Sequence, residues 1–285
     1  MAEALTHSLH SPRVLTALSL VACIAACTIF AGTLAPHDPG EQNLLAILTP
    51  PAWDAGGDPS YLLGTDSLGR DVLSRLIYGS RTAMLVAFFA SLGAMIIGTI
   101  LAHISGYFGG AVDWIIGRMV DVWMSFPPVI LSLILMVGLG VGLRNVILAI
   151  ILVDWTRFCR VLRSEVLIVT RNDYVAAARL LGFTHWQTII REVLPATLPL
   201  LITLISIEMA IAVVVEAILS FVGLGVGADQ PAWGQMIADA RQYVYQSPSN
   251  LLLPIVAIFL TVAAFNLLGD GLRRTLDVRL TETGR

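Results

Sequence analysis

The chain has 285 residues, of which 56% are hydrophobic and only 13% charged, and its formal net charge is −3. Soluble domains carry about a quarter charged residues, so this composition excludes an ordinary water-soluble enzyme and indicates one integral membrane domain. All 17 basic residues are Arg. Three cysteines, Cys23, Cys27 and Cys159, lie in or beside apolar runs, a pattern that predicts neither a disulfide framework nor a metal site.

The first apolar run follows a short polar start, residues 1–13, and covers residues 14–35 without a charge. About 20 apolar residues suffice to cross a bilayer as a helix. The run continues well beyond Cys23, where a processed lipoprotein would turn polar, so the pattern favours an uncleaved first span over a cleaved signal peptide.

The segment 36–81 is rich in Pro, Gly and Asp and is predicted to lie outside the membrane. Near its end, Leu73, Leu76 and Ile77 fall on one helical stripe. This spacing predicts an amphipathic helix lying on the membrane surface before the second span. The polar residues off that stripe are Arg70, Asp71, Ser74 and Arg75.

The second and third spans follow. Residues 82–102 form an apolar run in which Gly93 and Gly98 would permit close helix contact. The third span opens with charges at Asp113, Arg118 and Asp121, which we expect to pair or to sit at the interface, and runs to about residue 142.

The third span contains two consecutive prolines, Pro127 and Pro128, after Phe126. Prolines inside a membrane helix leave backbone carbonyls unpaired and kink the helix. The kink is either a flexing point at the gate of a transport pathway, which would involve Phe126 and Pro127, or a packing feature.

A fourth span, residues 145–162, leads into the polar stretch 172–195, which the spacing divides into two short helices. Asp173 is a candidate cap for the first helix, and Gly182 is placed to end it. Thr184 and Gln187 form a capping box for the second helix, which is expected to end against Leu194 and Pro195. An ordinary amphipathic loop helix at the bilayer surface fits the same spacing.

The fifth span, residues 195–222, carries Glu208 and Glu216, and residues 251–269 form the last span. Isolated carboxylates at membrane depth are costly and usually face the bundle interior or an aqueous path. Eight residues apart, the two fall on roughly the same side of a helix. Both readings stay open here: they line a solute pathway, or they form interhelical hydrogen bonds.

The stretch 172–195 resembles the cytoplasmic signature of importer-type ABC permeases, which is Glu-Ala-Ala, three residues, Gly, nine residues, Ile, one residue, Leu-Pro. Here Ala176 stands at the Glu position and Glu192 at the Ile position. The matching residues are Ala177, Ala178, Gly182, Leu194 and Pro195. In that family the element is the coupling helix, which docks on an ATPase subunit.

Three other strings resemble the peptide/nickel subfamily: 64–75 before the second span, 216–225 at the end of the fifth, and 266–279 in the tail. The resemblance implies a type I ABC importer permease fold, all-α with six spans, in which residues 82–280 form the core and 281–285 a tail. The coupling helix would cover about residues 173–191. The residues that it would use are Tyr174, Ala177, Ala178, Arg179, Leu181, Gly182, Glu192, Leu194 and Pro195.

The resemblance further implies a non-catalytic subunit of a di- or oligopeptide importer. Its partners would be a second permease subunit, two ATPase subunits that bind ATP and Mg, and an extracytoplasmic solute-binding protein. No cofactor site is expected in the chain itself, since the glycine-rich runs 106–110 and 223–227 lack the context of a phosphate loop.

Two alternatives remain for the function. Nickel or metal-chelate permeases look alike at these motifs. A secondary transporter would instead use Glu208 and Glu216 as proton carriers. A membrane enzyme based on Asp154, Glu208 or His103 lacks a converging nucleophile–base set.

The distribution of Arg predicts the orientation. With six spans both termini lie on one side, and 12 of the 17 Arg residues fall on that side. The positive-inside rule makes it the cytoplasm of a bacterial inner membrane, which also places the 172–195 stretch there. The five Arg residues on the other side are Arg70, Arg75, Arg81, Arg144 and Arg241.

Overall fold

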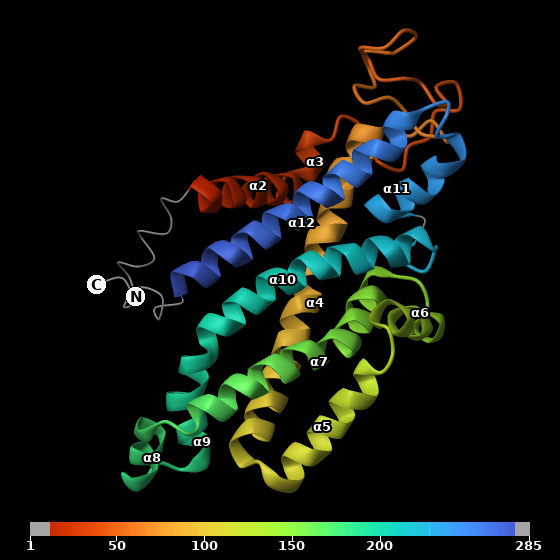
Figure 1. The fold of residues 1–285 in the computed structure, drawn as a ribbon. Helices are drawn as coiled ribbons and strands as arrows, with labels where there is room; N and C mark the ends of the chain where they lie inside the picture. Colours follow the sequence, from red (N-terminus) through yellow and green to blue (C-terminus); the bar gives the residue numbers. More distant parts are fainter. Residues whose placement is uncertain (1–11, 228, 277–285) are drawn as a thin grey trace.

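A computed structural model describes residues 12–227 and 229–276 of the chain. This part is helical, and its only β-type contact is an isolated bridge between Thr65 and Asp71. The N-terminal residues 1–11 and the tail 281–285 lie outside the described residues. The elements (Figure 1) are α2 (Pro12–Ile29), α3 (Ala31–Leu34), α4 (Val72–Phe108), α5 (Gly110–Met124), α6 (Pro128–Leu139), α7 (Leu143–Val169), α8 (Asp173–Leu180), α9 (His185–Thr188), the π turn η1 (Ile189–Val193), α10 (Leu194–Phe221), α11 (Trp233–Ala240), the 3₁₀ turn η2 (Arg241–Tyr243) and α12 (Pro248–Leu276).

The long helices α4, α7, α10 and α12 pack side by side, and α8 and α9 project at the end of the bundle opposite the 36–71 segment (Figure 1). Small residues set the spacing of α4 and α7. A Cβ at Gly98 would lie 2.6 Å from the carbonyl oxygen of Trp155, and one at Gly93 would collide with Ile151. The expected close helix contact at these two glycines is confirmed.

Length and composition make three described helical stretches able to cross a membrane: Val72–Phe108, His185–Phe221 and Pro248–Leu272. The pair α5 and α6 passes as one further span, although it is bent by 87° at its break. The predicted kink at Phe126–Pro128 is therefore a real break in the helix. Two of the six predicted spans lack this support, since the apolar stretch Leu15–Ile29 of α2 is too short and α7 carries several charges.

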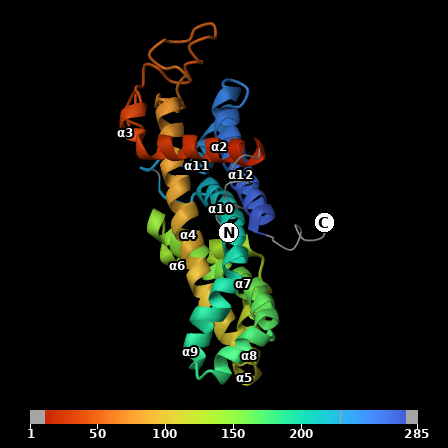
Figure 2. The ribbon, with the colours of Figure 1, turned by 90° about the vertical axis from the view of Figure 1, so that its left-hand side faces the viewer.

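The predicted first span, residues 14–35, is interrupted: α2 ends at Ile29 and α3 is a separate short helix. Figure 2 shows α2 running across α4 rather than alongside it. Although α2 packs on both α4 and α12, its described length does not make it a span by itself.

The beginning of α4 differs from the predicted surface helix. Residues 72–81 are the first turns of α4, which continues without a break to Phe108. The polar residues that the pattern assigned to solvent are the buried ones: Asp71 and Arg75 are each 2% exposed. The reason is tertiary, because the 36–71 segment and α11 cover this end of the helix.

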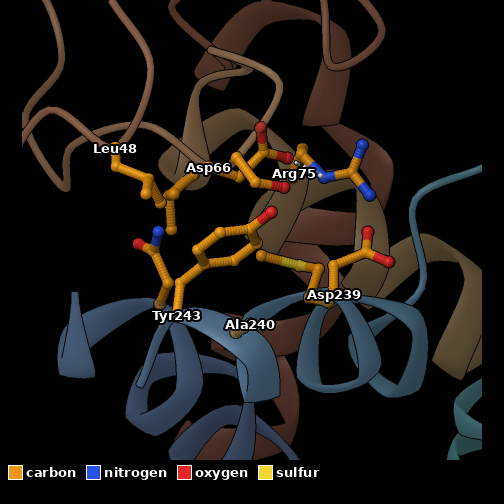
Figure 3. A pocket seen from close by; sticks show the side chains of 10 residues that line it. Leu48, Asp66, Arg75, Asp239, Ala240 and Tyr243 are labelled. Atoms are coloured by element: carbon orange, nitrogen blue, oxygen red, sulfur yellow. Dashed lines mark ion pairs between the residues drawn. The ribbon is translucent and has the colours of Figure 1, made fainter. Parts of the chain in front are cut away.

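Ion pairs and hydrogen bonds hold the 36–71 segment to α11 and to the first turn of α12. Arg70 donates to Asp66 at 2.6 Å and to Asp239 of α11 at 3.1 Å, and Asn250 donates to the backbone oxygen of Thr65 at 2.9 Å. Figure 3 shows the narrow pocket at this contact, where Asp66 and Arg75 face Asp239. Two segments almost 200 residues apart in sequence thus form one cap over the ends of α4 and α12.

Candidate functional site

The 172–195 stretch folds into two short helices joined at Gly182. Gly182 has φ +92°, its N–H donates to the oxygen of Arg179 at 3.1 Å, and the N–H of Phe183 donates to that of Ala178 at 3.2 Å. These two bonds form a Schellman motif, which turns the chain sharply after α8. The predicted glycine end of the first helix is confirmed.

The predicted start of the first helix is wrong by one residue. Asn172 is the N-cap of α8, and Asp173 is the first helical residue, where its charge still favours the positive end of the helix dipole. The capping box of the second helix is confirmed: Thr184 Oγ1 accepts from the Gln187 N–H, and Gln187 Oε1 accepts from the Thr184 N–H at 2.9 Å.

The second short helix does not end at Leu194 and Pro195. It passes through the π turn η1 directly into α10, so that Leu194 and Pro195 form the first residues of a long helix. The Leu194 N–H donates to the oxygen of Ile189, so Pro195 lies inside a continuous helix, directly after the π turn that accommodates it. Any movement of α9 therefore acts directly on α10.

Large apolar side chains are exposed on this element. Leu180 is 90% exposed and Leu181 is 80% exposed, although they are the last residue and the C-cap of α8. Such side chains on a projecting element are typical of a surface that a partner covers. Further exposed apolar residues on the same element are Tyr174, Trp186 and Ile190. We name these five residues the projecting apolar surface.

One of the residues expected to contact the ATPase, Ala178, faces the bundle instead. Ala177 and Arg179 are exposed, but Ala178 is 6% exposed and faces the protein. Ala178 lies on the inner face of α8 with Val175, which packs against Val166 and Val193. Ala178 therefore brings α8 close to its own bundle rather than to a partner, while Ala177, Leu181 and Gly182 remain accessible.

Aromatic contacts also attach the element to the end of α4. The Tyr107 hydroxyl lies 3.2 Å from Nδ1 of His185, and the Tyr107 ring stands edge-on to the imidazole at 5.7 Å between centroids. Phe108 contacts both His185 and Trp186. Sequence reasoning missed these contacts, because the two groups are 78 residues apart along the chain.

The two membrane carboxylates occupy different surroundings. Glu216 is fully buried and accepts a hydrogen bond from Ser220, one turn later, at 2.6 Å. Glu208 is buried against α7, where Arg157 donates to its Oε2 at 3.0 Å, and Asp154 lies 3.9 Å from the same guanidinium. The two carboxylates lie on roughly the same side of α10, but they have different partners and do not form one site.

A cavity of about 320 Å³ lies beside the Glu208 cluster, between α6, α7, α10 and α12. Asp154 and Arg157 line it, as do Pro128 and Val129 directly after the helix break, whereas Phe126 and Pro127 lie on the exposed break itself. The sequence alone suggested Asp154 only for a membrane enzyme and did not join it to Arg157 in one site. Their spacing of three residues, which places both on one side of a helix, was the signal that they lie together.

Charges at the start of the third span pair with α7, as expected. Asp121 lies 2.7 Å from both Arg118 and Arg160, and Asp113 forms an ion pair with Arg163. Within residues 12–227 and 229–276, no group of three or more His, Cys, Asp or Glu side chains is placed to hold a metal.

Comparisons with known proteins give a consistent result. The family model described as binding-protein-dependent transport system inner membrane component matches residues 94–282. The chain is 37% identical over 268 residues to the dipeptide transport system permease protein DppC of Haemophilus influenzae, covering 94% of this chain and 91% of that protein. It is 40% identical to the protein of the same name from Escherichia coli strain K12, covering 93% and 88%.

The nickel transport system permease protein NikC of Escherichia coli strain K12 is 36% identical over 264 residues, covering 93% of each chain. Among solved structures, a chain of the MetNI methionine ABC transporter in an inward facing conformation aligns with a TM-score of 0.59 at 20% identity, covering 72% of this chain and 97% of that chain. The described helices thus have the fold of a type I ABC importer permease.

Proposed function

We infer that this chain, which belongs to the family of binding-protein-dependent transport system inner membrane components, is a permease subunit of an ATP-driven importer of di- and oligopeptides. The observation that carries this function is the identity of 37–40% to dipeptide permeases over almost the whole chain. The chain supplies part of a membrane pathway, and no catalytic role is assigned to it.

In this proposal the 172–195 stretch is the coupling helix. Its projecting apolar surface would enter a groove of an ATPase subunit, and η1 would pass the movement of that subunit to α10. Rigid-body closure of partner subunits is a known route to alternating access. Support comes from the strong exposure of Leu180 and Leu181 and from the continuity of α9 with α10. The remaining coupling residues proposed are Tyr174, Ala177, Arg179, Gly182, Glu192, Leu194 and Pro195.

The partners follow from the same assignment. An importer of this family works with ATPase and solute-binding partners. We assign a second permease subunit, two ATPase subunits and an extracytoplasmic binding protein. ATP and Mg would bind to the ATPase subunits, and no cofactor is assigned to this chain. Both termini would lie in the bacterial cytoplasm, with the 36–71 segment outside.

Nickel import is the second candidate, supported by the 36% identity to a nickel permease. Peptides are preferred because the identity to dipeptide permeases is as high or higher. A secondary transporter would work without ATPase partners. Co-purification of an ATPase subunit with this chain would contradict that alternative.

Uptake of a labelled dipeptide and of labelled nickel is measured in cells with and without the gene. In the cells without the gene we expect loss of dipeptide uptake alone. Loss of nickel uptake alone would replace the peptide assignment with nickel import.

Gly182→Asp should abolish dipeptide uptake while the protein still inserts normally into the membrane. Gly56→Asp is the matched control, because Gly56 has φ +84° but lies in the 36–71 segment; its uptake should stay within about twofold of the parent. Normal uptake by Gly182→Asp would contradict the coupling assignment.

A further inference from the structure

A second pocket, of about 360 Å³, lies between α5 and α7 and shares no lining residue with the cavity beside Glu208. Its volume falls within the range of about 300–1,000 Å³ that is typical of small-ligand sites. Three guanidinium groups and two carboxylates line it among the described residues. These charged residues are Asp113, Arg118, Asp121, Arg160 and Arg163. The pocket is therefore basic.

The ion pairs of this pocket leave one guanidinium group without a carboxylate of its own. Arg163 and Asp113 form a closed pair, in which Nε and Nη2 of Arg163 each donate to one oxygen of Asp113. Asp121 is shared: its Oδ1 lies 2.7 Å from Nη2 of Arg160, and its Oδ2 lies 2.7 Å from Nη2 of Arg118. The pocket thus carries one positive charge in excess.

Arg118 and Arg160 keep donors for a ligand. Each uses Nη2 for Asp121, and their Nε and Nη1 groups have no other hydrogen-bond partner among residues 12–227 and 229–276. The two side chains are 63% and 51% exposed, so a ligand in the pocket can reach these donors. The planar guanidinium fork matches the oxygens of a phosphate or a carboxylate. The ligand chemistry that fits is an oxyanion.

The depth of the pocket points to the source of that oxyanion. α5 begins at Gly110, at the end of the bundle that carries α8 and α9 (Figure 1), and Arg118 follows eight residues later, a rise of about 12 Å. α7 ends at Val169 on the same side, and Arg160 precedes this end by nine residues, about 14 Å. In the proposed orientation both guanidinium groups lie near the headgroups of the inner leaflet.

Apolar side chains continue from the pocket along α5. Trp114 lines the pocket and is 67% exposed, while Met119 and Val122, closer to the middle of the membrane, are 47% and 58% exposed. Trp is enriched at the level of lipid headgroups. A charged pocket with apolar surface beside it fits an amphiphile better than a free ion.

We propose that this pocket binds the phosphate group of an anionic phospholipid, such as phosphatidylglycerol, from the inner leaflet. Arg118 and Arg160 donate to the phosphate oxygens, and the acyl chains pass along α5 over Met119 and Val122. Basic pockets between transmembrane helices on the cytoplasmic side are a recurring form of lipid headgroup site. The site does not depend on the cargo, and only its place in the inner leaflet rests on the proposed orientation.

Lipid selectivity is measured by fluorescence quenching with the whole transporter in nanodiscs. Val122→Cys carries a bimane, in a chain whose three native cysteines are replaced by Ala, and the same complex without Val122→Cys gives the background. The discs consist of phosphatidylcholine with a small, equal fraction of brominated phosphatidylglycerol or brominated phosphatidylcholine. We expect the brominated phosphatidylglycerol to quench about threefold more strongly or better, because the headgroup site enriches it beside α5.

Three variants test the role of the charges. Arg118→Gln or Arg160→Gln should lower the quenching ratio toward one, because either change leaves two guanidinium groups for two carboxylates. Asp121→Asn breaks the same ion pairs but adds to the positive excess, so it should raise the ratio. Arg171→Gln is the matched control, because Arg171 is exposed beyond the end of α7 and does not line the pocket. It should leave the ratio unchanged.

Four results would overturn the lipid site. They are a ratio of one in the parent, a ratio that neither Arg variant lowers, a ratio that falls in Asp121→Asn as it does in the Arg variants, and a lack of quenching by both lipids. The last result would show that the second permease subunit covers this face. Millimolar inorganic phosphate should act no more strongly than chloride at equal ionic strength. Specific displacement of the lipid by phosphate would assign the pocket to the free ion instead.

Discussion

Gly182 and the Asp154–Arg157–Glu208 cluster are the two places where single substitutions should have large effects. Gly182 turns the chain between the two short helices, and an ideal Cβ there would meet no atom within 4 Å. Within this chain the strain of a substitution therefore comes from the backbone, since φ +92° is strained for residues other than glycine, whereas Gly182→Asp also adds a negative charge to the face proposed to meet the ATPase. In the charged cluster the cause is different, because removal of one partner leaves another charge buried.

Gly182→Val should reduce dipeptide uptake by about tenfold or more, because a β-branched residue at positive φ costs at least about 1–2 kcal/mol and shifts the angle between α8 and α9. Gly182→Asn should keep most of the uptake, since Asn tolerates this backbone region. Both variants are measured at equal amounts in the membrane. Equal uptake by the two variants would refute the backbone explanation.

Arg157→Met should destabilise the chain by roughly 3–5 kcal/mol, because it leaves Glu208 buried without its cation. The double variant Arg157→Met with Glu208→Met should recover only part of that loss, because an apolar pair replaces the ion pair but Asp154 stays buried without a cation. Thermal unfolding of the purified complex in detergent measures both. A double variant as unstable as the single one would contradict this account.

The helices show how small residues and breaks set the geometry. α4 and α7 approach closely along Gly93, Gly98 and Gly106, each of which would collide with α7 if it carried a side chain. The break between α5 and α6 turns the chain by 87° and brings Pro128 to the cavity. At the far end, α4 contacts α9 through Tyr107, so the bundle and the coupling element form one unit.

Gly98→Ala should lower the thermal stability of the chain, because its Cβ would lie 2.6 Å from the backbone oxygen of Trp155 and force the helices apart. The expected cost is about 1–3 kcal/mol. Gly117→Ala is the control: the helix position is open, with no atom within 4 Å of an added Cβ. It should be neutral or slightly stabilising, since Ala favours helices. Similar melting temperatures for the two variants would contradict the packing argument.

Tyr107→Ala should lower the ratio of dipeptide taken up to ATP hydrolysed, because it removes both the hydroxyl and the ring that hold His185. Tyr107→Phe keeps the ring and should lose less. Uptake and hydrolysis are measured together in proteoliposomes with all subunits. An unchanged ratio in Tyr107→Ala would show that this contact does not transmit movement.

The whole molecule has two functional ends joined by long helices. The 36–71 segment and α11 form a cap at one end, and the projecting apolar surface lies at the other (Figure 1). The proposed orientation places the cap outside the cell, where a binding protein delivers cargo, and the coupling element in the cytoplasm. The Arg distribution supports this, because 12 of the 17 Arg residues fall on the side assigned to the cytoplasm.

Single cysteines test the orientation. Leu45→Cys should react with a membrane-impermeant maleimide in intact spheroplasts, because Leu45 is 99% exposed in the 36–71 segment. Leu181→Cys should react only after the membrane is opened. Both are made without the native cysteines. The reverse pattern of labelling would invert the topology.

Local features of this protein were predictable from its sequence. The membrane class follows from composition, and the break at Phe126–Pro128 and the glycine end of α8 follow from backbone chemistry within a few residues. The capping box of Thr184 and Gln187 is equally local. Such features depend on interactions between near neighbours, which the order of residues specifies directly.

Tertiary packing alone decided the rest. The first turns of α4 became buried because the distant 36–71 segment and α11 cover them, and the inner face of α8 turned toward the bundle because its Val175 packs against Val166 and Val193. Glu208 met Arg157 across 51 residues of chain. Burial and charge pairing depend on which helices become neighbours, and a pattern within one helix does not carry that information.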